Sequence, residues 1–426
     1  MNFQKRLSTY LVFPIVIFAS YLPSSVFAQV TGCTDPLSNN YNPAATVNDG
    51  SCTYNATSYT PPVKVNPLND AVVETSGLQM MGNYLWTFND SQGGATLYRI
   101  DTITNTILQQ ITLAGATNID WEDIAFDGRN VYIGDFGNNA NGARADLKIY
   151  KFPFNAIPDF INNYNATISA QLIERINFSY SDQPMPLVAT AANTTKYDCE
   201  AMLVDAGKIH LFTKNWANNN TTHYVIADTT AGTYSATPLE TLATNYLVTA
   251  ADKIPGQDVI ALLGYQNAGT ANHFMHLLSG YTAGNFFNGN KRKIDLPDVL
   301  YMGQSEGLTF RNGLYGYISN EKFVRTIFTT TITVNQQLHS FALTGLLQTV
   351  AKIYQFTGNG NWDVAANWSG NIVPPASLIG GSEIIIDPIA GGNCVLNISY
   401  TLSKGSQLTV RPGKNLIVSG SLDIQQ

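Results

Sequence analysis

One phrase recurs along this chain, and it constrains the fold more than any other feature. The clearest copy, at residues 121–139, is WEDIAFDGRNVYIGDFGNN. It begins with an acidic segment, continues as two short apolar strands joined by Asp127-Gly128, and ends in a polar loop. Asp-Gly between alternating apolar runs is a strong hairpin signal. Related copies, the last of them weaker, begin at Glu74, Glu200, Glu306 and Thr249.

A further predicted strand follows each hairpin at a similar distance, for example at 96–101 and 147–152. Self-similarity at a period of roughly 40–50 residues, built from strands and turns, is typical of a β-propeller. The sequence therefore predicts an all-β fold in which each copy is one blade and the first strand of each copy lines the central channel. Five copies are readable. The longer stretch at 153–198 predicts either an extra strand pair or an excursion between blades, so five and six blades both remain open.

The first 28 residues are predicted to be a signal peptide. They combine a basic start with an apolar run at 11–22 that is too short to cross a bilayer. Residues 26–28 fit a cleavage site, which would leave residue 29 at the start of the exported chain. The alternative is lipid attachment at Cys33, because residues 30–33 also fit the lipoprotein pattern.

A small module is predicted at residues 29–56. Cys33 and Cys52 bracket a run rich in Asn, Asp, Pro and Gly, and in an exported chain such a pair predicts a disulfide that staples a loop too small for its own core. The stretch resembles short modules of secreted multidomain proteins from marine Bacteroidetes-type bacteria. Its acidic and amide side chains either offer oxygens to calcium or form Asx-turns, and we favour the turns. The side chains concerned are Asp35, Asn48 and Asp49.

Two further boundaries follow from changes in composition. Residues 57–70 are predicted to be a proline-rich linker, and residues 63–350 to be the propeller. From residue 353 the pattern changes to short strands with glycine-rich corners, which resembles the opening rungs of β-solenoid modules in bacterial surface and adhesin-like proteins. Residues 353–426 are therefore predicted to form a β-solenoid-like module. Trp362 and Trp368 either stack on sugar rings or cap the solenoid, and we favour the cap.

Composition agrees with an exported protein that does not bind nucleic acid. Only 12% of the residues are charged, the formal net charge is −7, and no cluster of Lys and Arg is present. An acidic balance of this kind argues against nucleic acid and anionic membranes as partners. We expect a monomeric protein, secreted or at the cell surface with the periplasm as an alternative, that has no membrane span and takes a small molecule or a carbohydrate as ligand.

The propeller region resembles the calcium-dependent propellers of the gluconolactonase and phytase-like groups and their esterase-like relatives. The resemblance rests on the glutamates that open the inner strands and on phrases such as LWTFNDSQGG at 85–94. In those families channel acids and neighbouring Asn or Asp residues hold a metal ion. Carried to this chain, the resemblance implies a calcium site formed by Glu74, Glu122, Glu200, Glu306, Asn89, Asp135 and Asn215.

The chain departs from this pattern in two places. The fourth copy has Ala251 or Asp252 where the others have glutamate, which puts a complete ring of ligands in doubt. The basic cluster that grips phosphate in a true phytase is also missing, so phytate is not expected as the substrate. The lysines are scattered, at Lys148, Lys151, Lys214 and Lys322.

Carboxylates gathered at one axis repel each other, and their pKa values rise unless a cation lies between them. Oxygen ligands select a hard cation, calcium first, and a bound calcium ion can polarise a carbonyl group or activate water in lactone or ester hydrolysis. The alternative is that each glutamate bonds backbone N–H groups of its own blade. Two functions follow, a calcium-binding propeller with lactone or ester hydrolase activity and a non-catalytic extracellular binding protein, and no catalytic residue is assigned.

His273 and His276 are the closest pair of histidines. They are three residues apart in a predicted strand, so they face opposite sides and cannot share a metal ion. We interpret both as histidines whose hydrogen bonds are satisfied within the fold.

Overall fold

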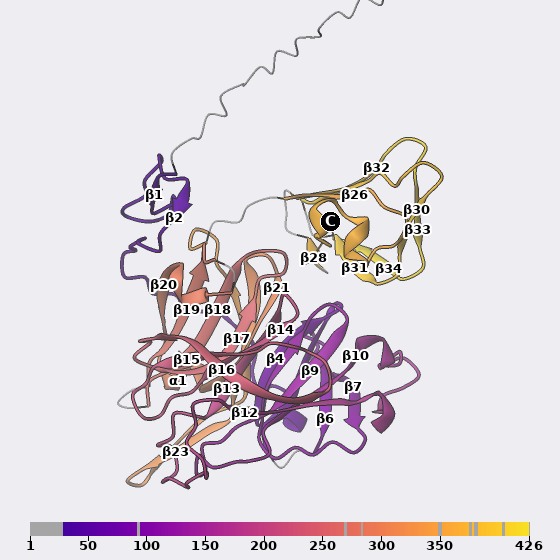
Figure 1. Cartoon of the computed structure of the whole chain (residues 1–426). Coiled ribbons are helices and arrows are strands. Elements are labelled where there is room, and N and C mark those ends of the chain that lie inside the picture. The colour runs from indigo at the N-terminus through magenta and orange to yellow at the C-terminus, as the bar shows by residue number, and fades with distance from the viewer. Residues whose placement is uncertain are drawn as a thin grey trace, which may run out of the picture.

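The computed structural model describes residues 29–91, 94–267, 271–282, 284–347, 352–374, 377–378, 382–402 and 405–425. The predicted signal peptide lies outside the described residues. Figure 1 shows a small N-terminal module, a propeller and a C-terminal module, all built almost entirely of β-strands. Across the described ranges, no helix has the length and apolar character needed to span a membrane.

Four sheets form the five blades of the propeller, because the outer strands of blades 2 and 3 pair with each other and join these two blades in one eight-stranded sheet. Blade 1 contains β4 (Thr75–Met81), β5 (Tyr84–Asn89), β6 (Thr96–Ile100), β7 (Ile107–Leu113) and, paired with β7, β11 (Asn165–Ile168). Blade 2 contains β8 (Trp121–Phe126), β9 (Asn130–Asp135), β10 (Lys148–Pro153) and β12 (Glu174–Tyr180). Blade 3 contains β13 (Cys199–Asp205), β14 (Lys208–Thr213), β15 (Thr221–Ile226) and β16 (Gly232–Leu242). Blade 4 contains β17 (Leu247–Lys253), β18 (Val259–Tyr265), β19 (His273–Ser279) and β20 (Asn290–Leu296).

Blade 5 contains β21 (Gln304–Asn312), β22 (Tyr315–Glu321), β25 (Gln337–Ala342) and β3 (Val63–Val65). A hairpin, β23 (Phe323–Ile327) and β24 (Thr330–Val334), is inserted between β22 and β25. Short helical turns lie in the connections: α1 (Val299–Met302), η1 (Asp70–Val72), η2 (Phe154–Ala156), η3 (Ala170–Leu172) and η4 (Phe286–Asn288).

The innermost strands form a closed ring of five. Strand β4 contacts β8, β8 contacts β13, β13 contacts β17, β17 contacts β21, and β21 returns to β4. The propeller therefore has five blades, and six is wrong. The stretch at 153–198 supplies β11, which extends blade 1, and β12, the outer strand of blade 2. Strand β3 closes the ring by pairing with β25, so part of the segment at 57–70 that was predicted as linker is a strand of blade 5.

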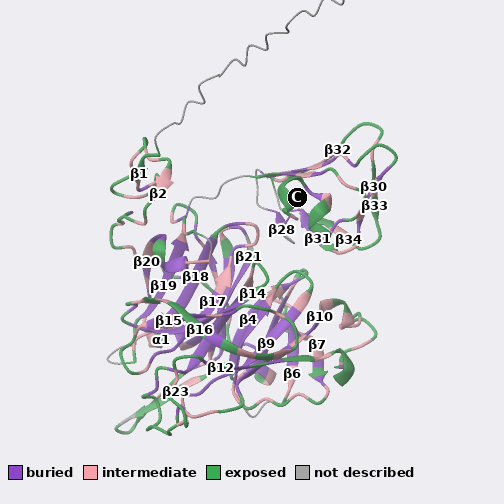
Figure 2. Ribbon diagram, in the orientation of Figure 1, coloured by how far each residue is buried: buried purple, intermediate pink, exposed green. Residues whose placement is uncertain are grey.

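Each interface between neighbouring blades is packed with its own apolar cluster. At the interface of blades 1 and 2, Trp121 is fully buried and meets Phe88 edge-on, with 5.3 Å between ring centroids. Figure 2 shows the resulting pattern, in which the propeller strands are mostly buried and the exposed residues lie largely in turns and connections. Burial of this apolar surface is the main force that holds the blades together.

The N-terminal module contains β1 (Thr31–Gly32), β2 (Val47–Asn48) and the predicted disulfide between Cys33 and Cys52. With its sulfur in this bond, Cys33 has no thiol for lipid attachment. The side chains of Asp35 and Asp49 each accept a hydrogen bond from the backbone N–H two residues later, at 2.9 and 3.0 Å, as in Asx-turns.

The disulfide gives the first prediction. A digest of the non-reduced protein should contain the Cys33 and Cys52 peptides linked, with the buried Cys199 and Cys394 as free thiols. By the loop-entropy relation, the link should stabilise the N-terminal module by about 3 kcal/mol. The Cys33→Ser/Cys52→Ser variant should therefore expose this module to protease while the main unfolding transition stays in place. Recovery of all four cysteines as free thiols from the native protein would contradict the prediction.

The C-terminal module is a β-solenoid with three faces, as predicted. Its parallel sheets are β26 (Ile353–Phe356), β29 (Glu383–Ile386) and β32 (Gln407–Val410); β27 (Gly360–Asn361), β30 (Asn393–Leu396) and β33 (Asn415–Val418); and β28 (Ser377–Leu378), β31 (Ser399–Leu402) and β34 (Ser421–Ile424). Two 3-10 turns, η5 (Ala365–Asn367) and η6 (Ser369–Asn371), precede the second rung. Trp362 and Trp368 are buried and pack edge-on, 4.8 Å apart, so they belong to the core of the module and present no stacking surface to a sugar.

The solenoid contacts the turns between the first and second strands of blades 1 and 2. Asn83 bonds Asp423 at 3.2 Å and Thr401 at 2.8 Å, and Arg129 forms an ion pair with Asp363. These turns lie at the end of each hairpin that is opposite to the segments carrying the predicted glutamates. We call the end of the propeller that carries the predicted glutamates the channel mouth. The contacts named above between the solenoid and the propeller lie at the opposite end.

Candidate functional site at the channel mouth

β-Bulges place three glutamates at equivalent positions in the ring. In blades 2, 3 and 5, the pairing between the innermost strand and its neighbour skips one residue, and the skipped residues are Glu122, Glu200 and Glu306. We call these the bulge glutamates. A bulge redirects a side chain relative to the regular strand, and bulges are common beside active sites. All three residues are at most 4% exposed.

Glu74 occupies a different position from the bulge glutamates. It lies before β4 and is exposed, and its carbonyl oxygen accepts a hydrogen bond from the backbone N–H of Asp90 at 3.0 Å. The carbonyl of Asp198 receives the same kind of bond from Lys214, at 2.9 Å. Glu74 is therefore the counterpart of Asp198, and the irregular segment of blade 1 contains Ser76. In blade 4 the skipped residue is Thr249. Thr249 therefore occupies the position of the bulge glutamates, and the predicted equivalence of Ala251 or Asp252 is wrong.

A buried lysine lies between two of the bulge glutamates. The Lys214 ammonium is 2.9 Å from Glu200 Oε2 and 3.6 Å from Glu306 Oε1, and all three side chains are about 4% exposed. Burial alone would lower the pKa of Lys214, but the carboxylates of Glu200 and Glu306 outweigh burial and raise it well above its usual value. Lys214 was one of the lysines that the sequence showed only as scattered. It supplies a cation inside the predicted glutamate ring.

Neutral donors also surround one oxygen of Glu306, whereas its Oε2 is buried and has no hydrogen-bond partner among the described residues. The Tyr265 hydroxyl and the Gln304 side-chain amide donate to Glu306 Oε1 at 3.1 and 2.9 Å. The same amide also donates to Glu321 at 3.3 Å. Because both donors end at the channel mouth, they form a layer above the carboxylates together with Lys214.

Two further carboxyl groups gather with the bulge glutamate Glu122 beside this layer. Oxygen atoms of Asp90, Asp120 and Glu122 all lie within 4.8 Å of one another, and we call these residues the acid trio. Burial, followed by the nearby Asp120 and Glu306, raises the pKa of Asp90 to about 8. Burial also raises the pKa of Asp120, and burial together with Glu200 and Asp90 raises that of Glu122 well above its usual range. At neutral pH the trio therefore retains protons that exposed carboxyl groups would release.

The acid trio has the donor chemistry expected for a hard divalent cation. Its ligands are carboxylate oxygens only, which suits calcium. Lys214 forms its ion pairs with Glu200 and Glu306 and with no member of the trio. Asp90 Oδ1 is buried and has no hydrogen-bond partner among the described residues. Gly137 leaves the space open, because a Cβ atom there would collide with Glu122 Oε1 and Asp120 Oδ2.

The other three residues in the predicted ligand set are engaged elsewhere. Asn89 accepts from Glu74 N at 3.2 Å and donates to the carbonyl of Ala71 at 2.9 Å. Asn215 caps its own loop by accepting from Ala217 N at 3.1 Å. The buried carboxylate of Asp135 pairs with Arg144 at 2.8 Å and with Lys148 at 3.2 Å. The structure thus brings Glu122, Glu200 and Glu306 together, and Asn89, Asn215 and Asp135 have local partners.

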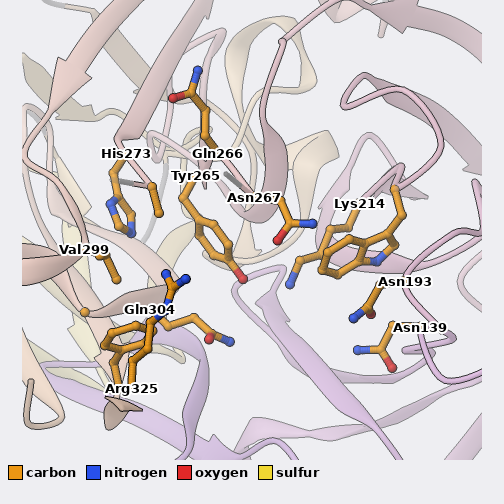
Figure 3. Close-up of a pocket in the computed structure, with 14 residues that line it drawn as sticks. Asn139, Asn193, Lys214, Tyr265, Gln266, Asn267, His273, Val299, Gln304 and Arg325 are labelled. Carbon is orange, nitrogen blue, oxygen red and sulfur yellow. The ribbon is translucent and has the colours of Figure 1, made fainter. Parts of the chain in front are cut away.

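A pocket of about 400 Å³ opens at the channel mouth above the layer of donors. Figure 3 shows side chains from several blades converging on it. Lys214, Tyr265 and Gln304 belong both to the pocket lining and to the hydrogen-bonded surroundings of the bulge glutamates. The remaining lining residues are Asn139, Asn193, Trp216, Gln266, Asn267, Ala271, His273, Val299, Gly303, Phe323 and Arg325.

Sequence reasoning misses Asp90 and Lys214 as site residues and favours a turn position for Asp120 over a catalytic one, although part of the signal is present. Asp120 precedes Glu122 by two residues and Asp198 precedes Glu200 by two. Residues two apart in an extended chain lie on the same side, so this Asp-x-Glu spacing would have placed both acids at one end of the channel. Nothing in the local sequence shows that Lys214 meets glutamates from two different blades.

No protein-family model matches the sequence, and no curated protein matches it. Among solved structures, the PQQ-bound aldose sugar dehydrogenase of Streptomyces coelicolor is 11% identical with a TM-score of 0.34, over 66% of this chain and 100% of its own. An α-L-arabinofuranosidase of Podospora anserina, solved with cellotriose, is 10% identical with a TM-score of 0.35, over 67% of this chain and 97% of its own. The catalytic domain of an α-L-arabinofuranosidase of Coprinopsis cinerea has the same identity and score, over 66% and 96%. At scores this low, the assignment of five blades rests on the strand order of this chain.

Proposed function

We propose that this protein is an exported, calcium-binding propeller that hydrolyses a lactone or an ester bound at the channel mouth. The observation that carries the proposal is the convergence of the acid trio within 4.8 Å, next to a pocket of about 400 Å³. Asp90, Asp120 and Glu122 would hold the ion. A calcium ion bound there would supply Lewis acidity for a carbonyl oxygen or a water molecule.

The residues of the chain provide the remaining functions of such a site. Lys214 Nζ, an ammonium with three hydrogens, is a donor at the floor of the pocket, suited to hold the carbonyl oxygen of a substrate. Lys214 connects the pocket to the bulge glutamates, because its ammonium lines the pocket and also pairs with two of these glutamates.

One observation favours a second candidate, a non-catalytic binding protein. None of the described residues that line the pocket carries a carboxylate. A ligand in the pocket would then touch donors, amides, aromatic rings and the His273 imidazole, but no carboxylate that could act as a general base. Turnover separates the two candidates: the hydrolase requires multiple turnovers of an ester or lactone, whereas the binding protein requires affinity alone.

Calcium should stabilise the folded protein. A ligand that binds only the native state contributes about 2.7 kcal/mol at a concentration one hundred times its dissociation constant. The full chain should therefore melt at a higher temperature in calcium than in chelator, and Glu122→Gln should lose most of this response. Glu74→Gln tests whether the exposed glutamate takes part, and Asp258→Asn, in an exposed turn, is the matched control. Identical melts of the wild type in calcium and in chelator would remove the ion from the proposal.

Hydrolysis is tested with the same variants. Gluconolactone and nitrophenyl esters are the probes, followed by pH-stat and by absorbance. We expect Glu122→Gln and Lys214→Met to lose at least a hundredfold in kcat/KM while Asp258→Asn keeps the wild-type value. Calcium binding without turnover of any probe by the wild type would favour the binding protein over the hydrolase.

A further inference from the structure

The charge of the pocket lining differs from that of the whole protein. The whole chain has a net charge of −7. The charged residues that line the pocket are nevertheless both cationic, Lys214 and Arg325, and none of the described lining residues carries a carboxylate. The acids lie beneath the layer formed by Lys214, Tyr265 and Gln304. Lys214 already pairs with Glu200 and Glu306, so Arg325 is the lining cation without a carboxylate partner among the described residues. It lies on β23, is exposed, and makes no ion pair with the described residues.

His273 gives the pocket wall a hydrogen-bond acceptor. The side chain is fully buried, and Nδ1 lies 3.2 Å from the carbonyl oxygen of Pro297. A carbonyl oxygen only accepts, so Nδ1 carries the proton and donates. Burial lowers the pKa of His273 to about 4, which leaves the ring neutral at pH 7. Nε2 is then a lone-pair acceptor, and it has no hydrogen-bond partner among the described residues.

A buried acceptor without a donor costs free energy, and a ligand hydroxyl would satisfy it. This revises the sequence interpretation that both histidines are satisfied. His276 is satisfied, because its Nδ1 meets the Tyr246 hydroxyl at 2.8 Å, but His273 is only half satisfied.

The rest of the lining offers amides and aromatic faces. The side chains of Asn139, Asn193, Gln266 and Asn267 make no hydrogen bond to other described residues, and Figure 3 shows them around the pocket. Amide groups both donate and accept, which matches the vicinal hydroxyls of a sugar ring. Trp216 and Phe323 are half-buried and present ring faces for stacking on apolar C–H surfaces.

We propose that the pocket binds a sugar that carries a carboxylate, a uronic acid, with its hydroxyls on His273 Nε2 and the amides and its carboxylate on Arg325. An arginine suits this role because its guanidinium matches a carboxylate through two parallel hydrogen bonds. The proposal deepens the proposed function by naming the ligand class of the same pocket. It does not require calcium or turnover.

The test is calorimetric titration of the full chain with glucuronate, galacturonate, their neutral parents glucose and galactose, trigalacturonate and acetate. We expect uronates to bind at least tenfold more tightly than the neutral sugars, and acetate not to compete. Arg325→Gln should lose that preference while keeping its affinity for neutral sugars. Gln266→Glu, which adds a negative charge to the lining at equal size, should abolish uronate binding. The control is Lys322→Gln, an exposed neighbour outside the lining, which should behave as wild type.

Tighter binding of trigalacturonate than of the monosaccharides would assign the ligand to an acidic polysaccharide, and equal affinities would assign it to free uronic acids. Equal binding of neutral sugars and uronates, an unchanged preference in Arg325→Gln, or no binding of any probe would overturn the proposal. Repeating the titration in Glu122→Gln and in chelator separates it from the hydrolase. Uronate binding that persists without any turnover supports this inference and counts against hydrolysis. Turnover of neutral lactones without a preference for uronates supports hydrolysis and counts against this inference.

Discussion

Lys214→Met is expected to lower the free energy of unfolding by about 3–5 kcal/mol, the usual cost of leaving a buried charge without its partner. Methionine keeps most of the volume of the lysine stem, so the change removes the ammonium with little loss of packing. Glu200 Oε2 and Glu306 Oε1 then lose the cation that lies 2.9 and 3.6 Å away. Urea unfolding at pH 8 measures the effect, and the deficit should shrink at lower pH as the carboxyl groups take up protons.

Two further variants identify the cause of this loss. Lys214→Met/Glu200→Gln removes one of the two stranded carboxylates, so it should recover part of the stability and show a non-additive coupling between the sites. Lys322→Met changes an exposed lysine and should stay within about 0.5 kcal/mol of the wild type. If Lys214→Met unfolds at the wild-type urea concentration, the ammonium does not compensate the bulge glutamates and the electrostatic account of the site is wrong.

The sequence predicted the parts of the fold that are local. Each blade hairpin is encoded within about twenty residues by apolar alternation and turn residues such as Asp127-Gly128, so the propeller class and the positions of the blades could be read directly. The blade count could not, because it depends on distant pairings. Strand β11 joins β7 across the first three strands of blade 2, and β3 reaches β25 at the other end of the propeller. A repeat period contains no information about either pairing.

The site was predicted only in part because side-chain direction in a strand changes with every residue. The sequence predicts Asn89 as a ligand, whereas it is Asp90, the next residue, that belongs to the acid trio. Glu74 was aligned with the bulge glutamates because all four begin a similar phrase, but the pairing register shows that it corresponds to Asp198. A bulge is a property of two paired strands, so a single strand's sequence does not reveal which residue it redirects.

Asp90→Asn is expected to stabilise the protein increasingly as the pH rises from 4 to 8. The pKa of Asp90 is raised from 3.8 to about 8 in the folded state, so over this range the folded wild type holds a proton that the unfolded chain has released. Folding stability therefore falls with rising pH through this window and levels off above it. Each unit between the two pKa values is worth about 1.4 kcal/mol, which puts the full difference on the order of 5 kcal/mol. Asparagine cannot ionise, so the variant escapes this loss.

The measurement is urea unfolding of wild type and Asp90→Asn at pH 5, 7 and 9, in chelator and in calcium. The two proteins share all five histidines, so their difference isolates Asp90. In chelator the gap should widen up to pH 8 and then stay constant, and the exposed Asp258→Asn should show no gap. A bound calcium ion favours the ionised carboxylate, so calcium should close the gap by stabilising the wild type alone. A gap that is the same at all three pH values would show that Asp90 ionises normally in the folded protein, and the acid trio would then lose its reason to bind a cation.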